Sequence, residues 1–141
     1  MEHKEIASSI SCFEMGMMGM QHWQGAWIGD GKDIHHEPAP YFRKKFEAGK
    51  EIKSARAYIA AAGLYELYIN GEKIGNHRLD PLYTRFDRRN LYVVYDVTSQ
   101  LRNGDNAIGV LLGNGWYNHQ SKAVWDFDRA PWRNRPAFCL D

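Results

Sequence analysis

The stretch Leu111-Leu112-Gly113-Asn114-Gly115-Trp116-Tyr117-Asn118 decides how the rest of this 141-residue chain is interpreted. Residues 106–112 are almost entirely apolar, which is typical of a strand that is covered on both faces in the middle of a sheet. The two glycines around Asn114 permit a sharp turn, and Trp116 and Tyr117 follow directly. Large rings that a buried strand places on a loop either stack on a ligand such as a sugar or close the core of a β-sandwich. The stretch alone leaves both interpretations open.

Alternating and apolar segments on both sides of this stretch predict further short strands. These segments, including a short one near the N-terminus, are residues 11–15, 41–47, 54–61, 63–69, 91–97 and 136–140. The dipeptide Asn70-Gly71 follows one of them and is the strongest short signal for a hairpin with a type I′ turn. With about eight short strands and no helix longer than a turn or two, the sequence predicts an all-β fold, a β-sandwich of the jelly-roll kind.

Composition divides the chain into two parts. Residues 15–20 combine four methionines with two glycines, a spacing that argues against a core helix. We therefore interpret residues 1–22 as the tail of a preceding domain plus a linker, and residues 23–141 as the β-sandwich domain. The last strand reaches the C-terminus without a closing turn, so we expect the domain to be truncated there.

Charge and composition exclude some partners and leave other questions open. Lys and Arg number 18 and Asp and Glu 17, so the formal net charge is +1 and gives no general attraction to nucleic acid or to an anionic membrane.

The sequence has no apolar run of about 18 residues and no signal peptide, and it leaves the compartment unknown. Cys12 and Cys139 could form a disulfide or remain two free thiols.

The motifs of common catalytic sites are missing from the sequence. It contains no Gly-x-Ser-x-Gly elbow, no phosphate-binding loop and no His-Glu-x-x-His. The pair His35-His36 in a loop rich in glycine and proline is a weak signal for a metal. Carboxylates are plentiful, but their spacing does not select the converging pair that glycoside hydrolysis needs. We therefore expect no catalytic activity from this chain itself.

Two loops carry the polar groups that could bind a ligand. Residues 76–90 form a long connection, and such loops tend to be functional or mobile. Asp80 and Asp87 lie in it, and their carboxylates could ligate Ca²⁺, meet sugar hydroxyls or form a structural network with nearby arginines. The second loop follows Asn118 and contains Trp125 and Asp126.

Several motifs, in this order along the chain, resemble the N-terminal accessory domain of bacterial α-L-rhamnosidases. The main ones are Gly63-Leu64-Tyr65-Glu66-Leu67-Tyr68-Ile69-Asn70-Gly71, Leu79-Asp80-Pro81, Tyr83-Thr84, Tyr95-Asp96-Val97-Thr98 and Gly113-Asn114-Gly115-Trp116-Tyr117. Trp27-Ile28-Gly29 and Pro40-Tyr41-Phe42-Arg43 also fit the pattern. The resemblance covers most of residues 27–117 and weakens after Asn118.

This resemblance implies a galactose-binding-like or jelly-roll β-sandwich that lies beside other β modules and an (α/α)₆ barrel. In the family, the barrel carries the acidic residues that release L-rhamnose from plant glycosides and polysaccharides. No catalytic residue is therefore carried over to this chain, and the parent protein is expected to be the enzyme. Some relatives of the accessory domain bind rhamnose through Ca²⁺. The sugar-binding candidates are Asn114, Trp116, Tyr117, Trp125 and Asp126, and the calcium candidates are Asp80 and Asp87.

Two functions follow from these observations, and the sequence leaves both open. In the first, the domain is non-catalytic and assists the binding of rhamnose-containing carbohydrates, with tryptophan rings covering the apolar face and the methyl group of the sugar. In the second, it is a scaffold that packs against other domains of the parent glycosidase, orients the barrel and has no ligand of its own. A self-contained lectin-like protein is a third interpretation, which the abrupt C-terminus disfavours.

Overall fold

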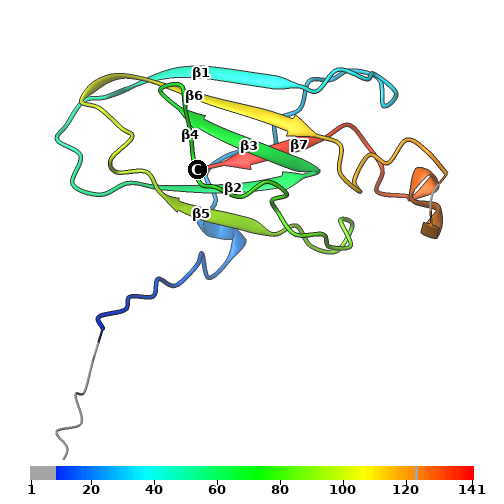
Figure 1. Cartoon of the computed structure of the whole chain (residues 1–141), viewed down its shortest axis with the longest axis horizontal. Coiled ribbons are helices and arrows are strands. Elements are labelled where there is room, and N and C mark those ends of the chain that lie inside the picture. The colour runs from blue at the N-terminus through cyan, green and yellow to red at the C-terminus, as the bar shows by residue number, and fades with distance from the viewer. Residues whose placement is uncertain (1–8, 123) are drawn as a thin grey trace, which may run out of the picture.

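The computed structural model describes residues 9–122 and 124–141 and contains seven strands there, arranged in two antiparallel sheets (Figure 1). The first sheet has the order β1 (Tyr41–Ala48), β6 (Gly104–Gly113), β3 (Leu64–Ile69) and β4 (Glu72–Lys73). The second has the order β5 (Tyr92–Asp96), β2 (Arg56–Ala62) and β7 (Ala137–Leu140). Two short 3₁₀ helices complete the fold, η1 (Met20–His22) and η2 (Val124–Arg129). The sheets face each other as two layers, so the predicted all-β sandwich is confirmed (Figure 1).

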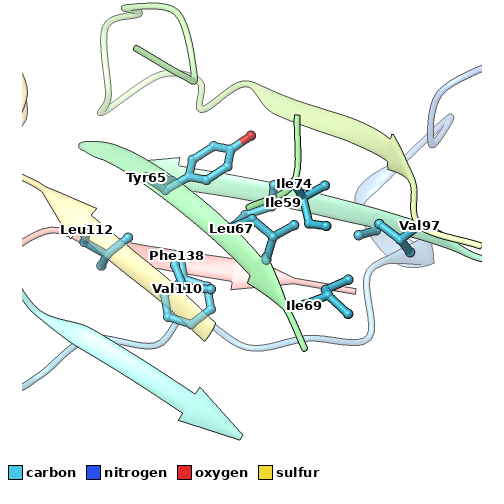
Figure 2. Close-up of a cluster of buried hydrophobic side chains, with 11 residues drawn as sticks. Ile59, Tyr65, Leu67, Ile69, Ile74, Val97, Val110, Leu112 and Phe138 are labelled. Carbon is cyan, nitrogen blue, oxygen red and sulfur yellow. The ribbon is translucent and has the colours of Figure 1, made fainter. Parts of the chain in front are cut away.

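The core lies between the two sheets, and alternate residues of β2, β3 and β6 point into it (Figure 2). In β3 the inward side chains are Tyr65, Leu67 and Ile69, which are all buried. On the opposite sheet, Ile59 of β2 is fully buried. Phe138 of β7 packs against a ring of the first sheet, that of Phe42 on β1, with 5.2 Å between the ring centroids.

The strand that precedes the turn of residues 113–118 lies in the middle of its sheet, as its apolar sequence predicts. β6 pairs with β1 on one side and with β3 on the other, so Val110 lies opposite both Phe42 and Leu67. Val110 and Leu112 are 2% and 1% exposed, and they fix this strand in the core.

The predicted hairpin at Asn70-Gly71 is also confirmed. Asn70 has a φ of 53° and Gly71 a φ of 88°, the left-handed conformation that a type I′ turn requires at both positions. The side chain of Asn70 also ties three segments together, because it donates to the carbonyl of Gln100 and accepts from the amide of Ala107.

The expected strand over residues 11–15 is wrong. These residues have no strand partner, and the side chains of Phe13 and Met15 are 93% and 72% exposed, so no sheet covers an apolar face there. The segment is held by polar contacts instead, including an ion pair between Glu14 and Arg56 with 2.8 Å between the charged groups. The division of the chain after residue 22 stays a prediction, and residues 1–8 lie outside the described residues.

Three further expectations can be compared with the structure. Cys12 is exposed and Cys139 is buried, and both are free thiols. His35 and His36 lie in the loop before β1, and His36 closes a turn by donating its amide to the carbonyl of Asp33. No helix of the described residues is long and apolar enough to cross a membrane.

The loop of residues 30–38 is fastened to the sandwich by one buried cation. The side chain of Arg135, which precedes β7, is only 5% exposed and pairs with the carboxylate of Asp30. It donates from Nε to Asp30 Oδ1 at 3.2 Å, and it also donates to the carbonyls of His36 and Pro38. One guanidinium therefore holds both ends of the loop.

This ion pair predicts a loss of stability in acid. Its hydrogen bonds lower the pKa of the Asp30 carboxyl from 3.8 to about 2, so the folded protein binds this proton less readily than the unfolded chain does. The pair therefore contributes its full stabilisation of about 2 kcal/mol above about pH 4, and the contribution disappears as the pH falls toward 2. Urea unfolding across this range should show the decrease. Asp30→Asn should reduce the dependence of the free energy of unfolding on pH in this range. The same pH dependence in the variant as in the original chain would contradict the assignment of the effect to Asp30.

Candidate functional site

The turn that follows β6 is closed by its own polar side chains. The amide of Asn118 donates to the carbonyl of Asn114 at 3.2 Å, and the Asn118 side chain donates to Asn114 Oδ1 at 3.3 Å. Asn118 is 1% exposed and also donates to the carbonyl of Ile34, in the loop that Arg135 holds. These hydrogen bonds fix the turn, and the side chain of Asn114 is used as an acceptor within it.

An aromatic cluster surrounds this turn at the end of the sandwich where η2 lies, on the right in Figure 1. Phe127 of η2 is 8% exposed and forms its centre, with ring centroids 5.5 Å from those of both Trp116 and Trp125. Tyr83 stacks on Phe127 at 5.7 Å. The members of the aromatic cluster are Tyr83, Phe86, Trp116, Tyr117, Trp125, Phe127 and Trp132.

The structure separates the predicted site residues into exposed and supporting ones. Trp125 is 72% and Trp116 44% exposed, their ring centroids are 6.4 Å apart, and the side chain of Asp126 is exposed beside them. Tyr117 instead packs against Phe86 with 5.1 Å between centroids, and burial raises the pKa of its hydroxyl. Trp116, Trp125 and Asp126 are therefore available to a ligand, whereas Tyr117 supports the cluster.

The backbone that presents Trp125 is strained. Trp125 and Asp126 have φ values of 75° and 50°, a left-handed conformation that residues with a side chain seldom adopt. Each such residue costs about 1 kcal/mol or more, and residues of this kind concentrate at ligand sites and switches. With this backbone conformation, the side chain of Phe127 is buried and the side chain of Trp125 stays at the surface.

A pocket of about 430 Å³ opens beside the aromatic cluster. Tyr83 and Phe86 from the long loop line it together with Trp116 and His119. Gly63 forms part of the wall, and a Cβ atom at this position would lie 2.5 Å from the carbonyl oxygen of Gly113. The lining is mainly apolar, which suits a ring or a methyl group better than a charged ligand.

The two calcium candidates are each occupied by protein partners. Asp80 Oδ2 lies 2.6 Å from Nδ1 of His77 and accepts a hydrogen bond from the hydroxyl of Tyr95 at 3.2 Å. Both oxygens of Asp87 accept hydrogen bonds from Arg85. Calcium takes six to eight oxygen ligands, and the part of the chain that the structure describes holds no group of three or more metal-binding side chains. Calcium binding at Asp80 and Asp87 stays a prediction.

Sequence reasoning did not select the inner members of the aromatic cluster. Phe127 is its centre, and Tyr83 and Phe86 bring the loop of residues 76–90 against it. The length of this loop was the one signal for Tyr83 and Phe86, because long loops tend to be functional. It did not indicate which of its side chains meet the turn after β6. Phe127 gave no such signal, since its burial depends on the left-handed backbone at Trp125 and Asp126.

Two packed antiparallel sheets define a β-sandwich module, and exposed tryptophans lie at one end of it. A family model described as "Alpha-L-rhamnosidase N-terminal domain" matches residues 50–141. The chain belongs to this family, and the resemblance seen in the sequence is confirmed.

Several curated relatives are named α-L-rhamnosidase. One from Formosa agariphila is 43% identical over 146 residues, which covers 88% of this chain and 14% of the relative. One from Alteromonas sp. is 34% identical over 121 residues, which covers 79% of this chain and 13% of the relative. The chain therefore spans about a seventh of the length of these relatives.

Solved structures of α-L-rhamnosidases share the fold. The enzyme from Dictyoglomus thermophilum gives a TM-score of 0.75 at 41% identity, covering 91% of this chain and 15% of that chain. The enzyme from Streptomyces avermitilis, solved in complex with L-rhamnose, gives a TM-score of 0.63 at 36% identity, covering 71% of this chain and 10% of that chain. The chain is thus similar to one domain of multidomain glycosidases.

Proposed function

We propose that this chain is the non-catalytic accessory domain of an α-L-rhamnosidase and assists the binding of carbohydrate at the aromatic cluster. The observation that carries the proposal is the pair of exposed rings, Trp116 and Trp125, that buried Phe127 holds beside a pocket of about 430 Å³. Trp116 is presented by a hydrogen-bonded turn and Trp125 by a strained backbone, and two tryptophans held at the surface in this way are unusual for purely structural loops.

The chemistry of the site favours a sugar with an apolar face. Indole rings provide broad apolar surfaces for the C–H groups of a pyranose, and the carboxylate of exposed Asp126 can accept hydrogen bonds from its hydroxyls. L-Rhamnose carries a methyl group in place of a hydroxymethyl group, and the mainly apolar lining between Tyr83 and Trp116 suits such a substituent.

A scaffold role is the second candidate, and a specific observation favours it. Leu79 and Leu82 on the rim of the same pocket are 69% and 72% exposed, and aliphatic side chains contribute less than aromatic rings to sugar recognition. Exposed apolar patches of this kind mark protein contacts. On this second proposal the aromatic end packs against another domain of the parent glycosidase and orients it.

Replacing Trp125 by alanine tests the first proposal. We expect calorimetric titration of the chain with L-rhamnose to give binding heat. Trp125→Ala should weaken binding by about tenfold or more, because the comparable stacking of a base on an aromatic ring contributes roughly 1–3 kcal/mol. Fold and stability should stay unchanged, since this side chain is 72% exposed.

Tyr41 offers a matched control, because it is 61% exposed on β1 and does not belong to the aromatic cluster. Tyr41→Ala should bind L-rhamnose like the unmodified chain. Titrations with and without Ca²⁺ test the prediction at Asp80 and Asp87 in the same experiment. Absence of heat in both conditions, from a sample shown to be folded, would overturn the carbohydrate proposal. Concentration-dependent association in sedimentation would then support the docking role.

A further inference from the structure

A second and separate pocket lies on the outer face of the three-stranded sheet. It has a volume of about 610 Å³, and Phe86 is the residue that it shares with the pocket of the aromatic cluster. Its floor is one row of residues across the three strands, Tyr92 of β5, Ala60 of β2 and Cys139 of β7. The small side chain of Ala60, between those of Tyr92 and Cys139, leaves room for the pocket above it.

One wall of this pocket is the segment of residues 23–27, which is fixed in place by the end of β7. The carboxylate of Asp141 accepts hydrogen bonds from the amides of Gln24 at 2.7 Å and Gly25 at 2.6 Å, and the Cys139 thiol donates to the carbonyl of Gly25. The absence of a side chain at Gly25 permits this approach, because a Cβ atom there would lie 2.8 Å from Asp141 Oδ1. The wall is therefore preformed, and it presents Trp27, which is 50% exposed.

The loop of residues 76–90 supplies positive charge to the pocket lining. Arg88 and Arg89 line the pocket next to Asp87, and their backbone amides donate to the carbonyl of Arg85. Within residues 9–122 and 124–141, neither guanidinium takes part in a hydrogen bond or ion pair, and the nearby Asp87 is engaged by Arg85 instead. Two guanidinium groups therefore remain available in the pocket that the exposed indole of Trp27 also lines.

We propose that this pocket binds a sugar that carries a carboxylate, a unit of the uronic acid class. An arginine guanidinium matches a carboxylate in geometry and charge, and an indole ring covers the apolar face of a pyranose. A neutral sugar leaves the two cations unpaired, and a simple anion leaves Trp27 uncovered, so Trp27 and the two cations together select a ring and a carboxylate in one molecule. The choice of a sugar over other anionic rings depends on the carbohydrate role proposed above, whereas the pocket itself has Phe86 in common with the aromatic cluster and otherwise a different lining.

The test is calorimetric titration of the chain with D-glucuronate, D-glucose and acetate. We expect D-glucuronate to bind and the two partial ligands to bind at least about tenfold more weakly, because each lacks one of the two contacts. The double variant Arg88→Gln/Arg89→Gln and the variant Trp27→Ala should each weaken D-glucuronate binding by about tenfold or more. The double variant Lys44→Gln/Lys45→Gln is the control. It removes the same charge from exposed positions of β1, and its affinity should stay within about twofold of the original, since charges beyond the Debye length are screened.

Each outcome supports or overturns the proposal, and the two proposed sites can fail separately. Equal binding of D-glucose or of acetate, equal weakening by the lysine control, or no heat from folded protein would each overturn the uronate site. L-Rhamnose titrations of the Arg88→Gln/Arg89→Gln variant should be unchanged, and D-glucuronate titrations of Trp125→Ala should be unchanged as well. If the unmodified chain binds D-glucuronate but not L-rhamnose, the result would count against the aromatic cluster and leave the uronate site standing.

Discussion

Arg135→Met is expected to lower the free energy of unfolding by about 3 kcal/mol, the range found when one partner of a buried ion pair is removed. The methionine fills a similar volume, but it leaves the carboxylate of Asp30, which is only 18% exposed, without its cation. The carbonyls of His36 and Pro38 also lose their donor. Denaturant unfolding at neutral pH would measure the loss.

Two companion variants make the mechanism testable. Arg135→Lys keeps the charge but cannot reach Asp30, His36 and Pro38 together, so it should lose less stability than Arg135→Met. Asp30→Asn/Arg135→Met removes the stranded carboxylate and should recover part of the loss. A double variant that is no more stable than Arg135→Met would show that the lost carbonyl contacts, and not the unpaired charge, account for the effect.

Gly63→Ala is expected to destabilise the fold by about 3 kcal/mol or more, because two penalties coincide there. Gly63 has a φ of 117°, which residues with a Cβ atom avoid, and the added methyl group would meet the Gly113 carbonyl oxygen at 2.5 Å. Gly113 is the residue from which the turn that carries Trp116 starts. A variant that still folds should therefore show a displaced aromatic cluster and altered tryptophan fluorescence.

Gly104→Ala provides the control for backbone conformation without a collision. Gly104 has a φ of 85°, and a Cβ atom at this position meets nothing within 4 Å. Its substitution should cost only about 1 kcal/mol, the usual penalty for a left-handed non-glycine residue. Equal losses in the two variants would show that the approach of Gly63 to Gly113 does not limit stability.

The sheet positions were predictable where the sequence carries a local rule. The apolar run before Gly113 placed β6 in the middle of a sheet, and Asn70-Gly71 located a hairpin, because each pattern depends on neighbouring residues alone. The strand expected over residues 11–15 failed because β-propensity is context-dependent, and Phe13 finds no sheet to cover it.

The candidate site was predictable only in part for the same reason. Trp116 and Trp125 could be chosen as rings in polar loops, and both are exposed in the structure. The distinction between Asp126, which stays at the surface, and Asn114, which holds the turn together, depends on hydrogen bonds to Asn118. Contacts between loops that are distant in sequence, such as Tyr83 on Phe127, follow from tertiary packing and leave no local pattern.

The fastening of residues 24–28 to the strand β7 has a consequence for the order of events during folding. The hydrogen bonds from Gln24 and Gly25 to Asp141 join residues 117 and 116 positions apart, and Ile28 pairs with Phe138. A ribosome makes the first of these segments long before the second, so Gln24, Gly25 and Ile28 lack these partners until β7 emerges. Contacts this distant in sequence form slowly, so we expect residues 24–28 to be among the last segments to dock during folding.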